Sequence, residues 1–450
     1  MNTTNTTNTT LWIRQALIIT MCGEQDVFSG DILLENERIV GVYGQQPEQR
    51  ELLKQQVAQL GRLDRIIDAS GMAVMPGLIN AHQHSPMNLL KCFSDDLKLM
   101  DWLEQKMFPA EARMTPADIY WGSKLSMAEM IRSGTTAFAD MYIHMNEIAQ
   151  AVQETGMRAS LTRGLVFGDE RGQQRIQEAI ELVERWHGGA DGRITTMFGP
   201  HAPYTCPPQQ LREVIQLAES YQLPVHIHLA ETKEETAQIA ARYGQTPTQY
   251  LSELGLFEHL HVLLAHGVHI TSADMNNLKG MRGGIAHNPL SNLKLGCGIA
   301  PVLELQRQSI TVGLGTDGAG SASTLDMFAG IRAASLLQKL YYGDPAVQSA
   351  YRFLQMATID SARLLQIDHE VGTLEAGKKA DLILIDLNKP HLQPLHHVIS
   401  AIAYAVNGAD VHTTIVNGRV LMDNYELLTL DEQQLLQQGR ERSQRLVSGL

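Results

Sequence analysis

The sequence predicts an α/β protein, namely a distorted (β/α)8 TIM barrel with a small β-sandwich domain built from both chain ends. Three observations predict this fold. From residue 76 to 367, short apolar runs alternate with amphipathic stretches, which is the rhythm of βαβ units. Eight such runs follow one another, and no glycine-rich dinucleotide fingerprint favours an open sheet. The flanking segments, 11–75 and 368–450, are rich in β-type runs and turns.

The candidate barrel strands can be placed one by one. They are, in order, GLINAHQH, TTAFADMY, MRASLTRGLVF, ITTMFGPH, LPVHIHLAE, HVLLAHGVH, GGIAHNP and TVGLGTDG. Between the first two, Thr115, Pro116 and Asp118 give the start signal of a helix, because threonine and aspartate cap a first turn and proline fits within it. That helix is expected to end near Gly134. The C-terminal segment is expected to complete the β domain and to add a last helix.

Composition and charge exclude two classes of partner. The chain has 450 residues, of which 44% are hydrophobic, and this is enough for one large barrel and a smaller domain. Its formal net charge is −13 and its lysines and arginines are scattered, so we expect no nucleic-acid partner. No run approaches the roughly 18 apolar residues of a membrane span, so we expect no membrane contact.

The start of the chain and the cysteines indicate the compartment. Residues 1–10 are a polar repeat, MNTTNTTNTT, which predicts a disordered tail and lacks the charged start and apolar core of a secretory signal. The four cysteines lie far apart and form no CxxC pair, so we expect neither a disulfide framework nor a cysteine zinc site. A reducing cytoplasm fits this composition.

Histidines and acidic residues gather at the predicted strand ends. The first strand ends in His82 and His84, which share one face of an extended segment because they are two residues apart. Taken alone, this pattern could equally be two polar residues at a strand end. Candidates at other strand ends are His201 on the fourth strand, His226, His228 and Glu231 on the fifth, His266 on the sixth and Asp317 on the eighth.

These side chains are expected to meet, because all the strands of such a barrel point their carboxyl ends at one mouth. Imidazole nitrogens and a carboxylate suit one divalent metal ion, Zn²⁺ or Fe²⁺. Spacing alone does not choose between His226 and His228 as the ligand from the fifth strand, since they share a face. The fourth strand has no lysine to bridge two metals, so a single ion is expected.

Several motifs together resemble the amidohydrolase superfamily: VMPGLINAHQH, HIHLAET, LLAHGVH, NPLSNLKL, GLGTDG and GTLEAGKKADLIL. The segment SPMNLLKCFSDDLKLMDWLEQKMFPAEA is similar to the methylthioadenosine/S-adenosylhomocysteine deaminase group within it. The resemblance covers nearly the whole chain beyond the tail. It implies one divalent metal ion, preferably Zn, held by His82, His84, His228 and Asp317.

The resemblance also implies roles for residues around the metal. Glu231 is the expected proton shuttle, Asp317 the base, and His266 lines the site. Glu111 is expected to contact the ribose hydroxyls, although it could instead pair with Arg113 or cap a helix. Further substrate contacts are expected from His201, Arg163 and Trp102, the last of which could be ordinary packing.

The implied activity is hydrolytic deamination of an adenosine-type nucleoside, such as 5′-methylthioadenosine or S-adenosylhomocysteine, by a cytoplasmic homo-oligomer, a dimer or tetramer. An aminohydrolase or chlorohydrolase of a free purine base or s-triazine stays open, because it needs the same metal site. A binding protein that has lost catalysis could also keep the fold, but every expected ligand and Glu231 are present. Departures from the family at 320–323, Cys92 and Cys297 concern the substrate rather than the metal.

Overall fold

The computed structural model describes residues 9–450. The polar repeat expected to form a tail therefore lies outside the described residues, except for its last two. Of these, Thr10 is not part of a tail. It begins β1 (Thr10–Ile19), and its backbone N–H donates to Asp64 Oδ2 over 2.9 Å. The first strand of the structure thus includes a residue that the sequence assigned to the tail.

Eight parallel strands, hydrogen-bonded in chain order, form the predicted barrel. They are β6 (Leu78–Gln83), β7 (Thr135–Tyr142), β8 (Arg158–Leu165), β9 (Ile194–Pro200), β10 (Val225–Leu229), β11 (His261–His266), β12 (Arg282–His287) and β13 (Thr311–Leu314). Contacts just beyond β13 bridge the last strand to the first, because the N–H of Asp317 donates to His82 O over 2.9 Å. The N–H of Thr316 donates to Asn80 Oδ1 over 2.9 Å. The barrel is nearly closed, and the predicted fold class is confirmed.

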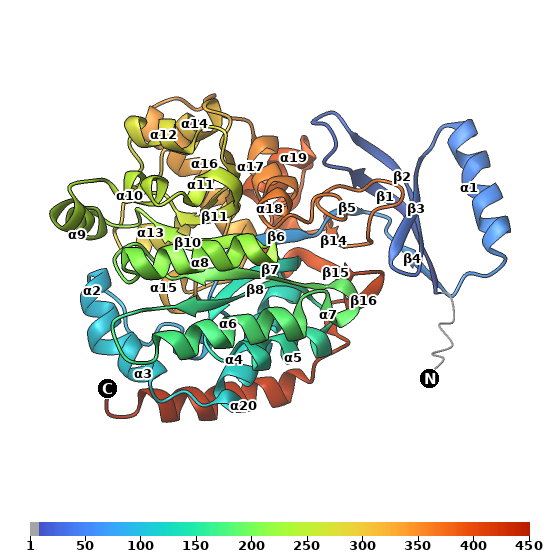
Figure 1. Cartoon of the computed structure of the whole chain (residues 1–450). Coiled ribbons are helices and arrows are strands. Elements are labelled where there is room, and N and C mark those ends of the chain that lie inside the picture. The colour runs from blue at the N-terminus through green and yellow to red at the C-terminus, as the bar shows by residue number, and fades with distance from the viewer. Residues whose placement is uncertain (1–8) are drawn as a thin grey trace.

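Helices follow the strands and cover the outside of the barrel (Figure 1). α4 (Pro116–Arg132) shows the predicted start, with a capping box between Thr115 and Asp118. The other helices between β7 and the end of the barrel are α5 (Met145–Thr155), α6 (Gly172–Trp186), α7 (Gly189–Gly192), α8 (Pro208–Tyr221), α9 (Lys233–Tyr243), α10 (Pro247–Glu253), α11 (Leu256–His259), α12 (Ser272–Leu278), α13 (Pro289–Lys294), α14 (Val302–Arg307), α15 (Ala319–Ala322), α16 (Met327–Tyr342), α17 (Ala350–Met356) and α18 (Ile359–Leu364). No helix in the described range 9–450 is both long and apolar enough to cross a membrane.

The segment between β6 and α4 runs as short helices over the mouth of the barrel. These are η1 (Ser85–Leu90), α2 (Leu99–Trp102), η2 (Leu103–Met107) and α3 (Phe108–Glu111). α4 packs on η1, and the Ser126 hydroxyl donates to Ser85 O over 2.6 Å. The chain that follows the two histidines of β6 is therefore fixed against a long helix.

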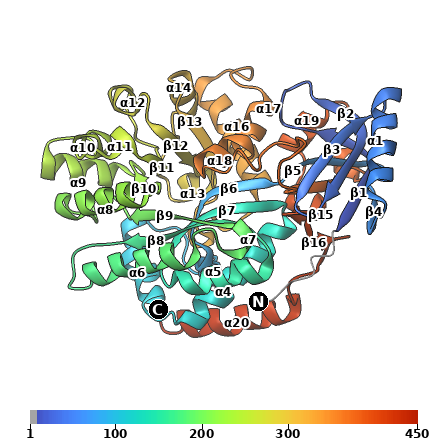
Figure 2. The ribbon, with the colours of Figure 1, turned by 45° about the vertical axis from the view of Figure 1, so that its right-hand side comes forward.

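Both ends of the chain join in a second, mixed sheet of nine strands beside the barrel (Figure 2), as predicted. β1 lies parallel to β4 and β5 and antiparallel to β2, and β14 from the C-terminal part pairs with β5. Buried aliphatic side chains such as Ile13, Ile32 and Leu382 form a core on this sheet. Besides β1, the strands are β2 (Val27–Glu35), β3 (Arg38–Gly44), β4 (Arg65–Asp68), β5 (Met72–Pro76), β14 (Leu382–Asp386), β15 (Val411–Val416), β16 (Arg419–Asp423) and β17 (Glu426–Leu427).

Two helices in the structure differ from the sequence-based expectation. α1 (Pro47–Leu60) was not predicted, and it buries Leu53 with Leu33 and Tyr43 of the sheet. α20 (Glu432–Val447) was grouped with the C-terminal β segment, but it lies along α4 of the barrel (Figure 1). The other helical turns near this end are η3 (Pro390–Leu392), α19 (Val398–Tyr404), which packs on α16 and α17, and η4 (Gly408–Asp410).

A buried ion pair joins the barrel to the sheet. Arg158, at the start of β8, donates to Asp381 from Nε over 2.8 Å and from Nη2 over 3.1 Å. The Asp381 carboxylate also accepts the N–H of Asn417 over 2.7 Å, and its carbonyl accepts the N–H of Gly77 over 3.1 Å. The two side chains are 3% and 1% exposed, so each charge depends on the other for compensation.

Removal of this arginine is expected to destabilise the protein. Arg158→Ala leaves the Asp381 carboxylate buried without its cation, and breaking a buried pair in this way costs about 3–5 kcal/mol of unfolding free energy. Chemical denaturation followed by circular dichroism measures the loss. Arg38→Ala is the control, because Arg38 pairs with Glu37 at the surface and such pairs contribute at most about 1 kcal/mol. Equal stability of the two variants would show that the contact between the barrel and the second sheet does not depend on the Arg158–Asp381 ion pair.

Candidate functional site

The four residues expected to bind a metal come together at the carboxyl ends of their strands. His82 lies in β6, His84 directly after it, His228 in β10, and Asp317 follows β13. His84 Nε2 lies 3.3 Å from Asp317 Oδ1, and His82 Nε2 lies 3.6 Å from the same oxygen. His228 Nε2 lies 3.4 Å from His84 Nε2. One nitrogen from each histidine falls within 4.8 Å of the others, so one ion could touch all of them.

The same ring nitrogen of each histidine faces the centre, because the other one is already engaged. His84 Nδ1 donates to Met141 O over 2.6 Å, and His228 Nδ1 donates to His201 O over 2.7 Å. His82 Nδ1 lies 2.8 Å from His226 Nε2. An Nδ1–H that donates outward leaves the Nε2 lone pair free to point inward, which is how metal-binding imidazoles are usually held.

The donor set fits a divalent cation. His82 Nε2 is buried and has no hydrogen-bond partner within the described residues, although an unpaired buried nitrogen is costly. Three imidazole nitrogens and one carboxylate oxygen around a common point are ligands that Zn²⁺ or Fe²⁺ accepts. These residues therefore form a candidate site for a divalent metal ion.

Asp317 is oriented by hydroxyl groups on its far side. Its Oδ2 accepts from Ser291 Oγ over 2.6 Å and from Ser321 Oγ over 2.8 Å. Its Oδ1 accepts the N–H of Gly318 over 2.7 Å and is the oxygen that faces His82 and His84. One oxygen is therefore saturated, and the other is turned toward the site.

Glu231 and His266 stand beside this cluster. Glu231 Oε2 lies 3.9 Å from His266 Nε2, and His266 Nδ1 donates to Asn292 Oδ1 over 2.9 Å. Burial raises the pKa of the Glu231 carboxyl, whereas the pKa of Asp317 is held well below its usual range by the surrounding histidines, against the effect of its burial. Two neighbouring carboxyl groups with pKa values pushed apart are suited to different roles, one as proton donor and one as base.

The backbone bends sharply where these residues leave the strands. Ala230, His266 and Asp317 all have left-handed conformations, with φ of 50°, 76° and 66°. For residues other than glycine, such conformations cost of the order of 1–3 kcal/mol and persist only where neighbouring contacts hold them. The positions of the site side chains therefore depend on the hydrogen bonds around each bend.

Two of the residues expected to contact substrate border the cluster. Glu111, the last residue of α3, is half-buried and accepts a hydrogen bond from the Tyr142 hydroxyl. It does not pair with Arg113, whose Nη1 donates instead to the carbonyls of Leu446 and Ser448. The ring of His201 lies 4.7 Å from that of His228, and its Nδ1 bonds Thr205 Oγ1 over 3.1 Å.

The other two expected substrate contacts have partners within the protein. Arg163 Nε donates to Glu178 Oε2 of α6 over 2.8 Å, and its Nη1 also bonds Gly164 O. Its charge is therefore already compensated. Trp102 is buried, donates from Nε1 to Ser94 O over 3.1 Å, and packs close to Gly320 after β13. Both assignments stay predictions, and Trp102 shows the packing role that the sequence left open.

Sequence reasoning assigned no role to several residues that hold the site. Ser291 and Asn292 come from one turn of α13 and bind Asp317 and His266, and Ser321 lies in the stretch that departs from the family. The motif NPLSNLKL was visible, but nothing in it indicated which side chains it would meet. Tyr142 is the last residue of β7, a strand buried along its whole length, and nothing in the strand sequence TTAFADMY indicated that this side chain would meet Glu111.

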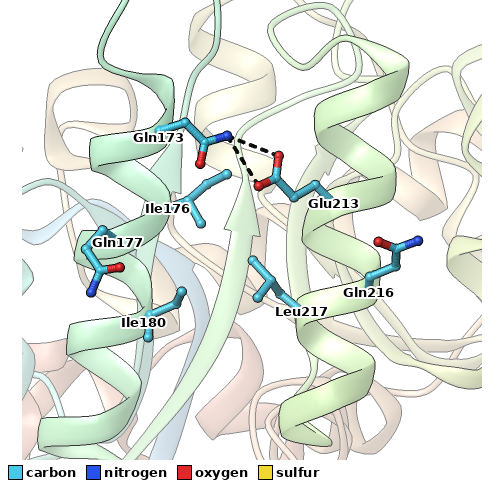
Figure 3. Close-up of a pocket in the computed structure, with 7 residues that line it drawn as sticks. All are labelled: Gln173, Ile176, Gln177, Ile180, Glu213, Gln216 and Leu217. Atoms are coloured by element: carbon cyan, nitrogen blue, oxygen red, sulfur yellow. Dashed lines mark hydrogen bonds between the residues drawn. The ribbon is translucent and has the colours of Figure 1, made fainter.

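A separate surface pocket lies between α6 and α8 on the outside of the barrel (Figure 3). Gln173 Nε2 of α6 bonds the Glu213 carboxylate of α8 over 3.3 Å across it, and Ile176 and Leu217 line its floor. None of the predicted site residues lines this pocket. The candidate catalytic and metal-binding residues therefore lie at the strand ends and not in this pocket.

Comparison with known proteins decides the family. The model of the amidohydrolase family matches residues 73–421, which span the whole barrel and, in the second sheet, nearly all of β5, all of β14 and β15, and the first part of β16. The chain belongs to the amidohydrolase family. This amidohydrolase is 47% identical over 439 residues to a protein of Pelotomaculum thermopropionicum named 5-methylthioadenosine/S-adenosylhomocysteine deaminase, covering 97% of this chain and 98% of that one. A protein of the same name from Moorella thermoacetica is 50% identical and covers 84% of this chain and 88% of its own.

Solved structures resemble the amidohydrolase along its whole length. An adenosine deaminase from Xanthomonas campestris with bound zinc superposes with a TM-score of 0.90 and 33% identity, covering 97% of this chain and 98% of that one. The atrazine chlorohydrolase TrzN from Arthrobacter aurescens, complexed with zinc, has a TM-score of 0.87 at 23% identity, covering 96% of this chain and all of its own. At that identity the second likeness shows the shared fold alone.

Proposed function

We propose that this amidohydrolase hydrolytically deaminates an adenosine-type nucleoside, 5′-methylthioadenosine, S-adenosylhomocysteine or a related 5′-substituted adenosine, to the inosine analogue and ammonia. The observation that carries the proposal is the convergence of His82, His84, His228 and Asp317 beside Glu231. The relatives at 43–50% identity all bear the name of this deaminase, and the similar Xanthomonas campestris structure is described as an adenosine deaminase.

These residues are proposed to hold one divalent ion, preferably Zn²⁺ with Fe²⁺ as the alternative. When bound, such an ion supplies a hydroxide nucleophile near neutral pH, because it lowers the pKa of water from about 15.7 to about 7. The Oδ1 atom of Asp317 faces His82 and His84, and the lowered pKa of this carboxyl keeps it ionised, so it would serve as the base that takes a proton from the attacking water. Its other oxygen cannot turn inward while Ser291 and Ser321 donate to it.

Glu231 and His266 are proposed to act on the substrate. A protonated Glu231 donates to N1 of the purine, which lets the ring accept the electron pair as C6 becomes tetrahedral. The proton that Asp317 has taken from water then passes to the amino group, which leaves as ammonia. The hydroxyl on C6 returns its proton to Glu231 and becomes the carbonyl of the inosine product. His266 Nε2 faces this carboxyl because Asn292 holds its other nitrogen. His266 can therefore steady the oxygen that adds to C6.

The ribose is proposed to bind at Glu111. If this carboxylate accepts the 2′- and 3′-hydroxyls, Glu111→Ala leaves them unpaired, and hydrogen bonds to charged groups are worth about 1.5–3 kcal/mol each. We expect kcat/KM for 5′-methylthioadenosine to fall about 10- to 100-fold, while the 2′,3′-dideoxy analogue is a poor substrate for both enzymes and changes little. Steady-state assays of ammonia release with both substrates measure this double difference.

Tyr142→Phe is the matched control for that experiment. It removes the hydroxyl that donates to Glu111 and keeps the carboxylate, so a smaller loss is expected. An equal loss of activity with the ribose and the dideoxy substrate after Glu111→Ala would mean that Glu111 is structural. A preference for a ring without sugar would then favour hydrolysis of a free base or triazine.

We further propose that the enzyme works in the cytoplasm as a homo-oligomer, a dimer or tetramer. All four cysteines are free in the structure, which suits a reducing compartment. α16 exposes Leu336, Leu340 and Tyr341 by 53%, 77% and 56%, and apolar side chains clustered in this way are typical of subunit interfaces. Sedimentation velocity of the wild type and of Leu340→Glu tests the assembly.

A further inference from the structure

Glu235 is a buried carboxylate in the first turn of α9, next to the proposed catalytic centre. Its side chain is 3% exposed. Its Oε1 accepts the backbone N–H of Ala230 over 2.9 Å, and its Oε2 accepts the backbone N–H of Glu231 over 2.8 Å. The carboxylate thus spans two consecutive peptide groups just after β10.

This arrangement differs from an ordinary helix cap. Thr232 is the N-cap of α9, and its hydroxyl accepts the N–H of Glu235 over 3.1 Å. In a capping box the third helical residue returns a hydrogen bond to the N–H of the N-cap itself. Glu235 instead reaches past Thr232 to the two residues before it. Thr232 would cap the helix without this contact. The Glu235 carboxylate therefore stabilises the backbone at Ala230 and Glu231 rather than the start of α9.

The bend that Glu235 holds sets the direction of Glu231. Ala230 lies in the left-handed region at φ 50°, a conformation that alanine adopts only when neighbouring contacts impose it. On its other side, the carbonyl of Ala230 accepts the N–H of His269 over 2.8 Å. Two anchors therefore fix this peptide, and the Glu231 side chain leaves it toward His266.

A carboxylate holds both N–H groups better than an amide of the same length. Burying a charge is costly, and the hydrogen-bond partners of Glu235 are neutral backbone groups rather than a lysine or arginine. Glutamine would be cheaper to bury, but its amide offers one acceptor oxygen and turns an N–H₂ donor toward the second N–H. The charge is thus explained by the need for two acceptors at this place.

We propose that Glu235 is a positioning residue that fixes the Ala230–Glu231 bend and thereby places the Glu231 carboxyl for proton transfer. This inference rests on the proposed role of Glu231. Within residues 9–450, the side-chain oxygens of Glu235 accept from the backbone N–H groups of Ala230 and Glu231, and neither residue is a proposed metal ligand. Glu235 would therefore act on the reaction through the backbone of this bend.

A double-mutant cycle tests the proposal with 5′-methylthioadenosine as substrate. Glu235→Gln is expected to lower kcat about 10- to 100-fold, since misplacement by about 1 Å can cost 10²-fold, with zinc content and KM close to wild type. Glu231→Gln is expected to lower kcat further, and the double variant to lie within about threefold of Glu231→Gln alone. Glu234→Gln, the same change at the exposed neighbouring position, is expected to match the wild type.

The possible outcomes distinguish the positioning role of Glu235 from the proposed catalytic role of Glu231. If the losses of the single variants multiply in the double variant, or if Glu235→Gln matches the wild type while Glu231→Gln is impaired, the positioning role is wrong. If Glu231→Gln itself turns over normally, the proposed function of Glu231 fails instead. Should Glu235→Gln not fold, Glu235→Asp, which keeps the charge but shortens the reach, takes its place in the cycle. Failure of both to fold would make Glu235 structural and overturn the proposal.

Discussion

Asp317→Asn is expected to remove nearly all turnover of 5′-methylthioadenosine while the fold is kept. The amide that replaces the carboxylate can still be held at the Oδ2 position, because the hydroxyls of Ser291 and Ser321 can rotate to accept as well as donate. The atom that faces His82 and His84 is then a neutral amide oxygen, which neither accepts a proton nor offers a full negative charge to a cation. Since the proposed base and a proposed metal ligand are weakened together, we expect kcat to fall by about 10⁴-fold.

The measurement is kcat of the zinc-loaded variant, with zinc content and circular dichroism recorded on the same sample. Ser321→Ala is the matched control, because it removes one hydrogen bond to Asp317 and keeps the carboxylate. A modest loss is expected there, since Ser291 still holds Oδ2. Wild-type kcat in a folded, metal-loaded Asp317→Asn variant would end the assignment of Asp317 as base.

Glu231→Gln is expected to lower kcat without loss of the bound metal. The Glu231 side chain lies beside His266, and Cys297 Sγ lies 4.0 Å from its Oε1. Glutamine fills the same space but cannot give up a proton to the purine ring. General acid–base catalysis contributes about 10²–10⁴-fold, so kcat should fall by at least that order.

Metal analysis distinguishes this result from loss of a ligand. We expect Glu231→Gln to retain one zinc per subunit, because the four proposed ligands are intact. A variant that loses zinc, and regains its rate when zinc is added in excess, would identify Glu231 as a ligand rather than a proton shuttle.

The order of the barrel strands could be predicted because parallel strands buried on both faces appear as continuous apolar runs. The helix start at Thr115 was also predictable, since its capping box is local in sequence. α1 was missed although Leu53, Val57 and Leu60 recur at helical spacing and pack on the sheet, because the segment 11–75 was assigned to β structure as a whole. The position of α20 depends on Arg442 and Arg445 meeting Asp118, a contact between residues far apart in the chain.

In the candidate site, too, some residues could be predicted from the sequence and others could not. His82, His84 and Asp317 could be named because strand ends place them at one mouth, whatever the packing around them. The choice between His226 and His228 could not be made from spacing. In the structure His228 faces His84, whereas His226 lies against the back of His82. The family resemblance indicated His228, and the contacts of these two side chains with His84 and His82 now distinguish them in the structure.

The central claim, that these residues deaminate an adenosine-type nucleoside, is tested most directly by ammonia release from a substrate panel. The zinc-loaded enzyme is assayed with 5′-methylthioadenosine, S-adenosylhomocysteine, adenosine, adenine, guanine and melamine, and the nucleoside products are identified by mass. We predict the highest kcat/KM for one of the three nucleosides, with formation of the matching inosine and little release from the free bases or the triazine. A preference for guanine or melamine over every nucleoside would contradict the account.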